Sequence, residues 1–222
     1  MTTSFLSDLP RLALSFLLIL PAIILHEVAH GYVAYLLGDD TAKTRGRLTL
    51  NPISHIDPFG TLLLPVLLLA ASGGHAAFGY AKPVPINPNN FRGDKRWGML
   101  LTGAAGPAMN LVLAIVSGLV LRFAYPLLPN TAAGSIVLQV LVTFTLINLV
   151  LMFFNLIPLP PLDGSRVVQY FLPRSALRVY DQIERYGFIV IFGVLILLPG
   201  ILTGYLGITA YPLFHLITGI AL

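Results

Sequence analysis

The hydrophobic pattern divides the chain into long apolar runs joined by polar, basic or proline-rich connections. The apolar runs cover residues 11–37, 59–72, 98–125, 139–154, 187–203 and 205–222. At 1.5 Å per residue, the first run predicts a helix of about 40 Å, which is long enough to cross a hydrocarbon core of ~30 Å. The second run, 59–72, contains Pro65 and is shorter than the ~20 residues that a span requires, so it predicts a re-entrant segment. We therefore expect an all-α polytopic membrane protein with four to five transmembrane helices plus one re-entrant piece.

A possible strand lies between the apolar runs, at residues 78–87 (FGYAKPVPIN). Its aromatic and β-branched residues favour a strand, and Pro83 and Pro85 restrict that strand to a sheet edge. An irregular surface loop is the equal alternative. We carry the strand forward as a small membrane-associated β element.

Composition supports the membrane assignment. The 222 residues are 56% hydrophobic and only 10% charged, and the mean hydropathy is +0.85, which excludes an ordinary soluble domain. The net charge of +4 comes from basic loops, which indicates membrane orientation and not nucleic-acid binding. Residues 126–134 contain no Lys or Arg, so we expect this connection outside the cytoplasm and the basic loops inside it.

Three polar residues interrupt the first apolar run, in the sequence His26-Glu27-Val28-Ala29-His30. Positions i and i+4 share one face of a helix, so His26 and His30 can bind one metal ion while Glu27 lies about a quarter turn away. A chance match is the alternative, but polar groups at membrane depth carry a desolvation cost that a metal site would offset. The chain has no cysteine, so zinc here must be bound by His and carboxylate.

A catalytic zinc site usually has three protein ligands, and the candidates for the third are Asp57, His55, His75, Asp163 and His215. Asp163 is favoured because it follows a segment with three prolines in four positions, Pro158 to Pro161, which breaks the helix at membrane depth. A cap for a helix starting at Ser165 is the alternative role for Asp163. The isolated histidines His75 and His215 lack partner spacing, and we expect structural roles for both. The ligand set predicts peptide hydrolysis, with Glu27 as the proton acceptor.

Five sequence elements together resemble the site-2 protease family of intramembrane zinc metalloproteases, in its small bacterial form without a PDZ domain. The elements are HEVAH at 26–30, NPISHIDPFGT at 51–61, AKPVPIN at 81–87, AGPAMN at 105–110 and NLIPLPPLDG at 155–164. The resemblance implies one zinc per chain held by His26, His30 and Asp163, with Glu27 as catalytic base. It also implies that Asn155 supports the substrate or the developing oxyanion. Asn110 and His55, which lie in two of these elements, are further candidates for substrate binding or transition-state support.

We thus expect residues 1–222 to form a single intramembrane protease domain in the cell membrane, with its site inside the bilayer towards the cytoplasm. The expected substrates are membrane-spanning proteins or leftover signal peptides, whose unwound backbone could pair with the predicted edge strand. Two alternatives stay open: a metal transporter and a non-catalytic membrane scaffold. A transporter needs ligands along a path and has no use for a base such as Glu27.

Overall fold

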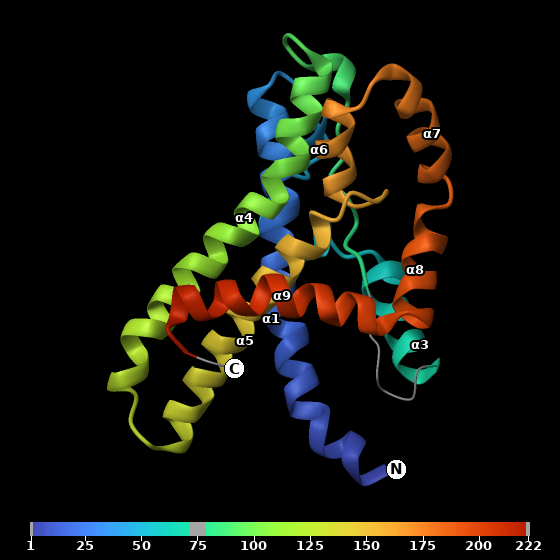
Figure 1. Ribbon diagram of the computed structural model, residues 1–222. Helices are drawn as coiled ribbons and strands as arrows, with labels where there is room; N and C mark the ends of the chain where they lie inside the picture. Colours follow the sequence, from blue (N-terminus) through green and yellow to red (C-terminus); the bar gives the residue numbers. More distant parts are fainter. Residues whose placement is uncertain (1, 72–78, 221–222) are drawn as a thin grey trace.

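The computed structural model describes residues 2–71 and 79–220, and it is built almost entirely of helices (Figure 1). The α-helices are α1 (Thr2–Leu36), α2 (Thr41–Thr44), α3 (Leu64–Ala71), α4 (Lys95–Ala124), α5 (Ala132–Asn155), α6 (Asp163–Phe171), α7 (Arg174–Glu184), α8 (Gly187–Leu197) and α9 (Pro199–Thr218). Short 3-10 or π turns cover Pro52–Ser54, Pro58–Leu63, Pro88–Asn90 and Tyr125–Leu127.

Four helices are long and apolar enough to cross a membrane, namely Ala13–Leu36, Lys95–Leu127, Ala132–Asn155 and Gly200–Thr218. They confirm the predicted all-α polytopic class, and the chain is a multi-pass membrane protein. Helix α8 has 11 residues, which is too short for the fifth span that the sequence allowed. The predicted re-entrant run corresponds to the π turn Pro58–Leu63 and α3, which together are also too short to cross. Its re-entry into the bilayer stays a prediction.

Helix α4 is the centre of the packing, because α1, α5, α6 and α9 all contact it. Figure 1 shows α1 and α4 side by side, α5 returning along α4, and α9 crossing both α4 and α5. The apolar core lies where α4, α5 and α9 meet, and it consists of Ala114, Leu121, Leu149, Ala210, Phe214 and Ile217 with their half-buried neighbours.

The proline-rich segment 156–162 ends α5 and leads into α6. Leu156 closes α5 at its C-cap, and Asp163 is the first residue of α6. Prolines at 158, 160 and 161 prevent the helix from continuing, as the sequence predicted. Because α6 packs on α4, this break returns the chain towards α4 with Asp163 at its leading end.

The predicted β element is wrong: the described residues contain no strand, and 79–87 has no regular secondary structure, while residue 78 lies outside the described part. The backbone N–H groups of this stretch bind separate partners instead of a neighbouring strand. Lys82 N donates to His55 O at 2.9 Å, and Val84 N donates to Glu27 Oε2 at 2.9 Å. Pro83 and Pro85 have no N–H, so a continuous ladder cannot form. We call residues 79–87 the proline strap.

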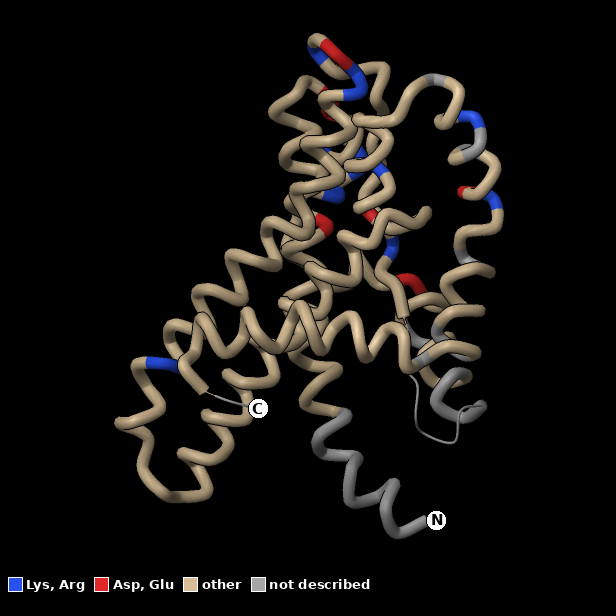
Figure 2. Tube along the Cα trace, in the orientation of Figure 1, with Lys and Arg blue, Asp and Glu red and all other residues tan. Residues whose placement is uncertain are grey.

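Charged residues are distributed unevenly along the chain trace (Figure 2). Most of the Lys and Arg drawn there lie around the ends of α1 and α4 that flank α6, and along α7. Arg122, in the last turn of α4, lies apart from them near the α4–α5 connection. This asymmetry follows the basic loops noted in the sequence.

Candidate metal centre

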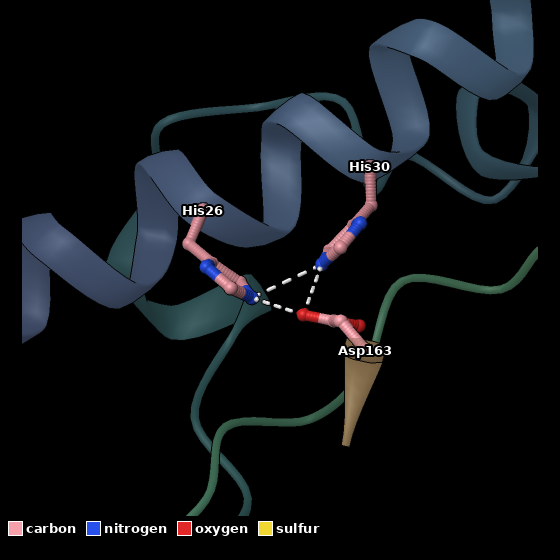
Figure 3. Close-up of side chains that lie close together, drawn as sticks. All are labelled: His26, His30 and Asp163. Carbon is pink, nitrogen blue, oxygen red and sulfur yellow. Dashed lines mark hydrogen bonds and ion pairs between the residues drawn. The ribbon is translucent and has the colours of Figure 1, made fainter. Parts of the chain in front are cut away.

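Three buried side chains from two distant parts of the chain converge on one point (Figure 3). His26 and His30 come from α1, and Asp163 comes from the start of α6. The two Nε2 atoms lie 3.0 Å apart, and Asp163 Oδ2 lies 3.1 Å from His26 Nε2 and 3.2 Å from His30 Nε2. The three atoms form a nearly equilateral triangle that can hold a metal ion.

The tautomer of His30 follows from its outer partner. His30 Nδ1 contacts the backbone oxygen of Thr102 at 2.5 Å. A carbonyl oxygen can only accept, so Nδ1 carries the proton and Nε2 presents a lone pair to the centre. Helix α4 therefore orients this imidazole through its backbone.

The tautomer of His26 follows from a chain of amides. His26 Nδ1 donates to Asn110 Oδ1 at 2.6 Å, and Asn110 Nδ2 donates to Asn148 Oδ1 at 2.9 Å. Asn148 Nδ2 then donates to the carbonyl of Phe144 at 2.8 Å, which fixes the direction of the whole chain. His26 Nε2 therefore also presents a lone pair, and second-sphere partners of this kind are typical of metal-bound histidines.

The residues at this point fit a zinc ion. Asp163 Oδ2 is buried and has no hydrogen-bond donor, and it faces two imidazole lone pairs. Three acceptors this close repel one another unless a cation lies between them. Their spacings also approach the ~3.3–3.4 Å edges of a tetrahedron with bonds of about 2.0–2.1 Å, the geometry that zinc prefers with His and carboxylate ligands.

Glycines on α4 make room for the site. A Cβ at Gly106 would lie 2.5 Å from His26 Nε2 and even closer to His30 Nε2. A Cβ at Gly103 would lie 2.9 Å from Arg166 Cβ, on the turn of α6 that carries Asp163. Any side chain at Gly106 would occupy the ligand space, so this glycine sets the distance between α4 and the imidazoles.

Glu27 lies beside this triangle but is not part of it. It follows His26 on α1, so it lies about 100° further round the helix. The side chain is half-buried, and Oε2 accepts the N–H of Val84 in the proline strap at 2.9 Å. The carboxylate is thus held by a backbone donor next to the candidate ligands.

The remaining candidates have other contacts. Asn155 donates to Leu151 O at 2.9 Å within its own helix. His55 is buried and donates through Nε2 to Thr49 O at 2.8 Å, while Asp57 caps the π turn by accepting from Phe59 N and Gly60 N. His215 is exposed on α9, and His75 lies outside the described residues.

Sequence reasoning did not identify three contributors to the site, namely the Thr102 carbonyl, Asn148 and the bare face of Gly106. A buried asparagine in an apolar span was a signal for Asn148, because such a group needs a partner. The Thr102 carbonyl is a backbone group that leaves no signature in the sequence, and Gly106, although it lies in the AGPAMN element, does not reveal which side chains it faces.

Comparisons with known proteins agree on one family. The model described as Peptidase family M50 matches residues 14–129 and 116–198. The chain is 46% identical over 177 residues to "Putative zinc metalloprotease YwhC" of Bacillus subtilis (strain 168), covering 79% of this chain and 76% of that protein. It is 31% identical over 178 residues to "Putative zinc metalloprotease Rip2" of Mycolicibacterium smegmatis, covering 80% of this chain and 64% of that one.

The Rip2 protein of Mycobacterium tuberculosis (strain Erdman), described in the same words, is 30% identical over 198 residues, which cover 89% of this chain and 71% of that protein. No solved structure matches the chain. The family match covers far more than half of the sequence and includes both histidines and Asp163. The chain therefore belongs to peptidase family M50, the site-2 protease family of intramembrane zinc metalloproteases.

Proposed function

We propose that this chain binds one zinc ion through His26, His30 and Asp163 and uses Glu27 of its HEVAH sequence as the base for peptide hydrolysis. The observation that carries the proposal is the set of three buried acceptor atoms 3.0–3.2 Å apart, with no donor for Asp163 Oδ2. Buried acceptors that face one another are costly without a partner, and a bound cation would supply one.

The chemistry divides between the ion and the chain. When bound, zinc supplies a Lewis acid that lowers the pKa of water and polarises a peptide carbonyl. Val84 N–H holds Glu27 Oε2, which leaves Oε1 to take the proton of the attacking water and return it to the leaving amine. The outer partners of His26 and His30 keep both Nε2 lone pairs directed at the ion.

We assign different roles to the supporting candidates. Asn110 acts on His26, because its oxygen accepts from that ring, and so we no longer propose substrate contact for it. Asn155 lies at the end of α5, before the segment that carries Asp163, and keeps its proposed role of supporting the substrate or oxyanion. His55 remains a candidate lining residue whose backbone oxygen holds the proline strap.

We further propose a location and substrates. The clustered Lys and Arg support an orientation with α6, α7 and the basic loops on the cytoplasmic side of the cell membrane, and hence a site nearer that side. Residues 1–222 act as one domain, and the π turn with α3 re-enters the bilayer beside the proline strap. The substrates are membrane-spanning proteins or signal peptides, since a bilayer site selects segments within or near the membrane. Nucleic acid is not a partner.

A metal transporter is the less favoured function. Among the described residues, the ligand-type side chains that can share one ion converge at a single point, instead of following a path between the two faces. The adjacent Glu27 also has no function in transport.

The test uses the full chain in proteoliposomes with a single-span substrate protein. Glu27→Gln should keep zinc and lower the cleavage rate about 10²–10⁴-fold, the range expected for loss of a general base. Glu184→Gln, an exposed carboxylate on α7, is the matched control and should cleave like wild type. Cleavage by Glu27→Gln at the wild-type rate would refute the proposed function.

A further inference from the structure

Helix α1 carries a second i, i+4 pair next to the two histidines. Glu27 and Gly31 face the proline strap, and both contact Val84. Val84 N donates to Glu27 Oε2 at 2.9 Å, while a Cβ at Gly31 would lie 2.8 Å from Val84 Cγ1. The buried Val84 side chain therefore rests on the bare backbone of Gly31, so its packing and its N–H fix it against the same face of α1.

The opposite side of the proline strap is held by the loop that follows α1. Arg47 Nη2 donates to Lys82 O at 2.6 Å, and Lys82 N donates to His55 O at 2.9 Å. Further along, Asn87 N donates to Asp39 Oδ2 at 2.7 Å. Val84 thus lies between two anchored residues, Lys82 and Asn87, and cannot shift along α1 without breaking these bonds.

Arg47 is an unusual anchor because it is a buried cation. Its residue is 7% exposed, and no carboxylate of the described residues forms an ion pair with it. A buried guanidinium is costly unless its N–H groups find acceptors; here Nη2 donates to the backbone oxygens of Lys82 and Pro83, while the buried Nε has no partner among the described residues. A neutral residue would serve general packing at lower cost, so this placement indicates a specific role in holding the proline strap.

The donor on the strap is also isolated. Pro83 and Pro85 have no N–H, so Val84 supplies the only backbone donor between them, and that donor points at Glu27. A carboxylate held by one fixed donor keeps its other oxygen in one orientation, which is the requirement for a general base.

We propose that the proline strap is the positioning element for the catalytic base: Val84 N–H orients the Glu27 carboxylate, and Arg47 holds Val84 in place. Both are positioning residues, and the inference rests on the proposed function of Glu27. Helix α1 then has two functions on two faces: the face with His26 and His30 binds the ion, and the face with Glu27 and Gly31 binds the proline strap.

The test compares two proline substitutions in the strap of the full chain. Val84→Pro removes the donor to Glu27, whereas Ile86→Pro adds a proline at a residue for which the described structure shows no N–H hydrogen bond. We expect Val84→Pro to keep its zinc and its KM within about twofold and to lose kcat about 10–100-fold, as for a small misplacement of a catalytic group. Ile86→Pro should stay within about threefold of wild type in kcat, because Val84 N–H is intact.

A second pair of variants tests the anchor. Arg47→Met should lower kcat about as much as Val84→Pro, and Arg47→Lys should restore part of it, since an ammonium can also donate to the Lys82 oxygen. Equal kcat in Val84→Pro and Ile86→Pro, a loss confined to KM, or loss of zinc in Val84→Pro would each overturn the positioning role. These outcomes differ from failure of the proposed function, in which Glu27→Gln itself would cleave normally.

Discussion

The two halves of α4 bury different kinds of surface, although both use small residues. The first half faces the metal centre with Thr102, Gly103, Gly106 and Asn110, while the second half faces the apolar core with Ala114, Gly118 and Leu121. One half therefore makes room for imidazole rings, and the other makes room for the side chains of α5 and α9.

The difference shows most clearly in the buried polar atoms. In the second half, Ser117 Oγ lies 2.9 Å from Thr145 Oγ1 of α5; one of the two hydroxyls donates to the other, and the second donates to a carbonyl of its own helix. That pair is complete without a ligand. At the metal centre, which the first half faces, Asp163 Oδ2 of α6 has no donor and faces two lone pairs. The polar pair in the apolar core is thus satisfied within the protein, whereas the carboxylate at the metal centre leaves an acceptor for a ligand.

The largest effect should come from adding one methyl group to each half. Gly106→Ala places a Cβ 2.5 Å from His26 Nε2, inside the ligand space, so zinc affinity and cleavage should fall at least about 100-fold. The Cβ of Gly118→Ala would meet Ile217 Cγ2 at 2.6 Å, which should cost about 1–3 kcal/mol of stability while zinc is kept. Metal analysis and thermal unfolding of both variants measure these effects, and full zinc in Gly106→Ala would contradict the comparison.

A smaller effect is expected along the amide chain behind His26. Asn110→Ala removes the acceptor of His26 Nδ1 and should weaken zinc binding about 10–100-fold, as is typical of second-sphere partners. Asn148→Ala should weaken it less, because Asn148 acts through Asn110. Competition with a zinc chelator gives both affinities, with Ser117→Ala as a control from the apolar half. An equal loss in all three variants would point to general destabilisation.

The smallest effect concerns Asp39, which anchors the proline strap. Burial alone would raise the pKa of this carboxyl, but hydrogen bonds from Thr41, Asn87 and Asn90 outweigh it and lower the pKa from its ordinary value. Because the folded pKa is depressed, this stabilisation is present above the unfolded pKa of about 3.9 and is lost as the pH falls through the folded pKa. Between roughly pH 5 and pH 3, the thermal unfolding temperature should therefore fall more steeply with decreasing pH for wild type than for Asp39→Asn. Parallel curves would rule out this contribution.

The main features of the site could be predicted from sequence because helix geometry and proline chemistry are local. The spacing of His26 and His30 places them on one face of any helix, and prolines such as those before Asp163 end a helix wherever they occur in its interior. These two rules identified the residues that the fold brings together. That the three residues meet at one point depends on how α1 and α6 pack against α4, and a local sequence pattern does not describe such packing.

The features that were missed or wrong depend on tertiary partners. The Thr102 carbonyl and the Val84 N–H are backbone groups, and their partners are known only once α1, α4 and the proline strap are packed. The strap resembled a strand because of its residue types. Its N–H groups instead bind a side chain or the backbone of separate loops, so it forms no ladder. The upper count of five spans failed because α8 ends at Leu197, before it is long enough to cross.

Zinc content of the purified chain tests the central claim most directly. Wild type and His215→Asn, a histidine exposed on α9, should each contain about one zinc per chain, and Asp163→Asn should contain less than roughly a tenth of that. Asp163→Asn keeps the shape of the side chain but removes the negative charge that balances the ion. Stoichiometric zinc in Asp163→Asn, or none in wild type, would contradict the account.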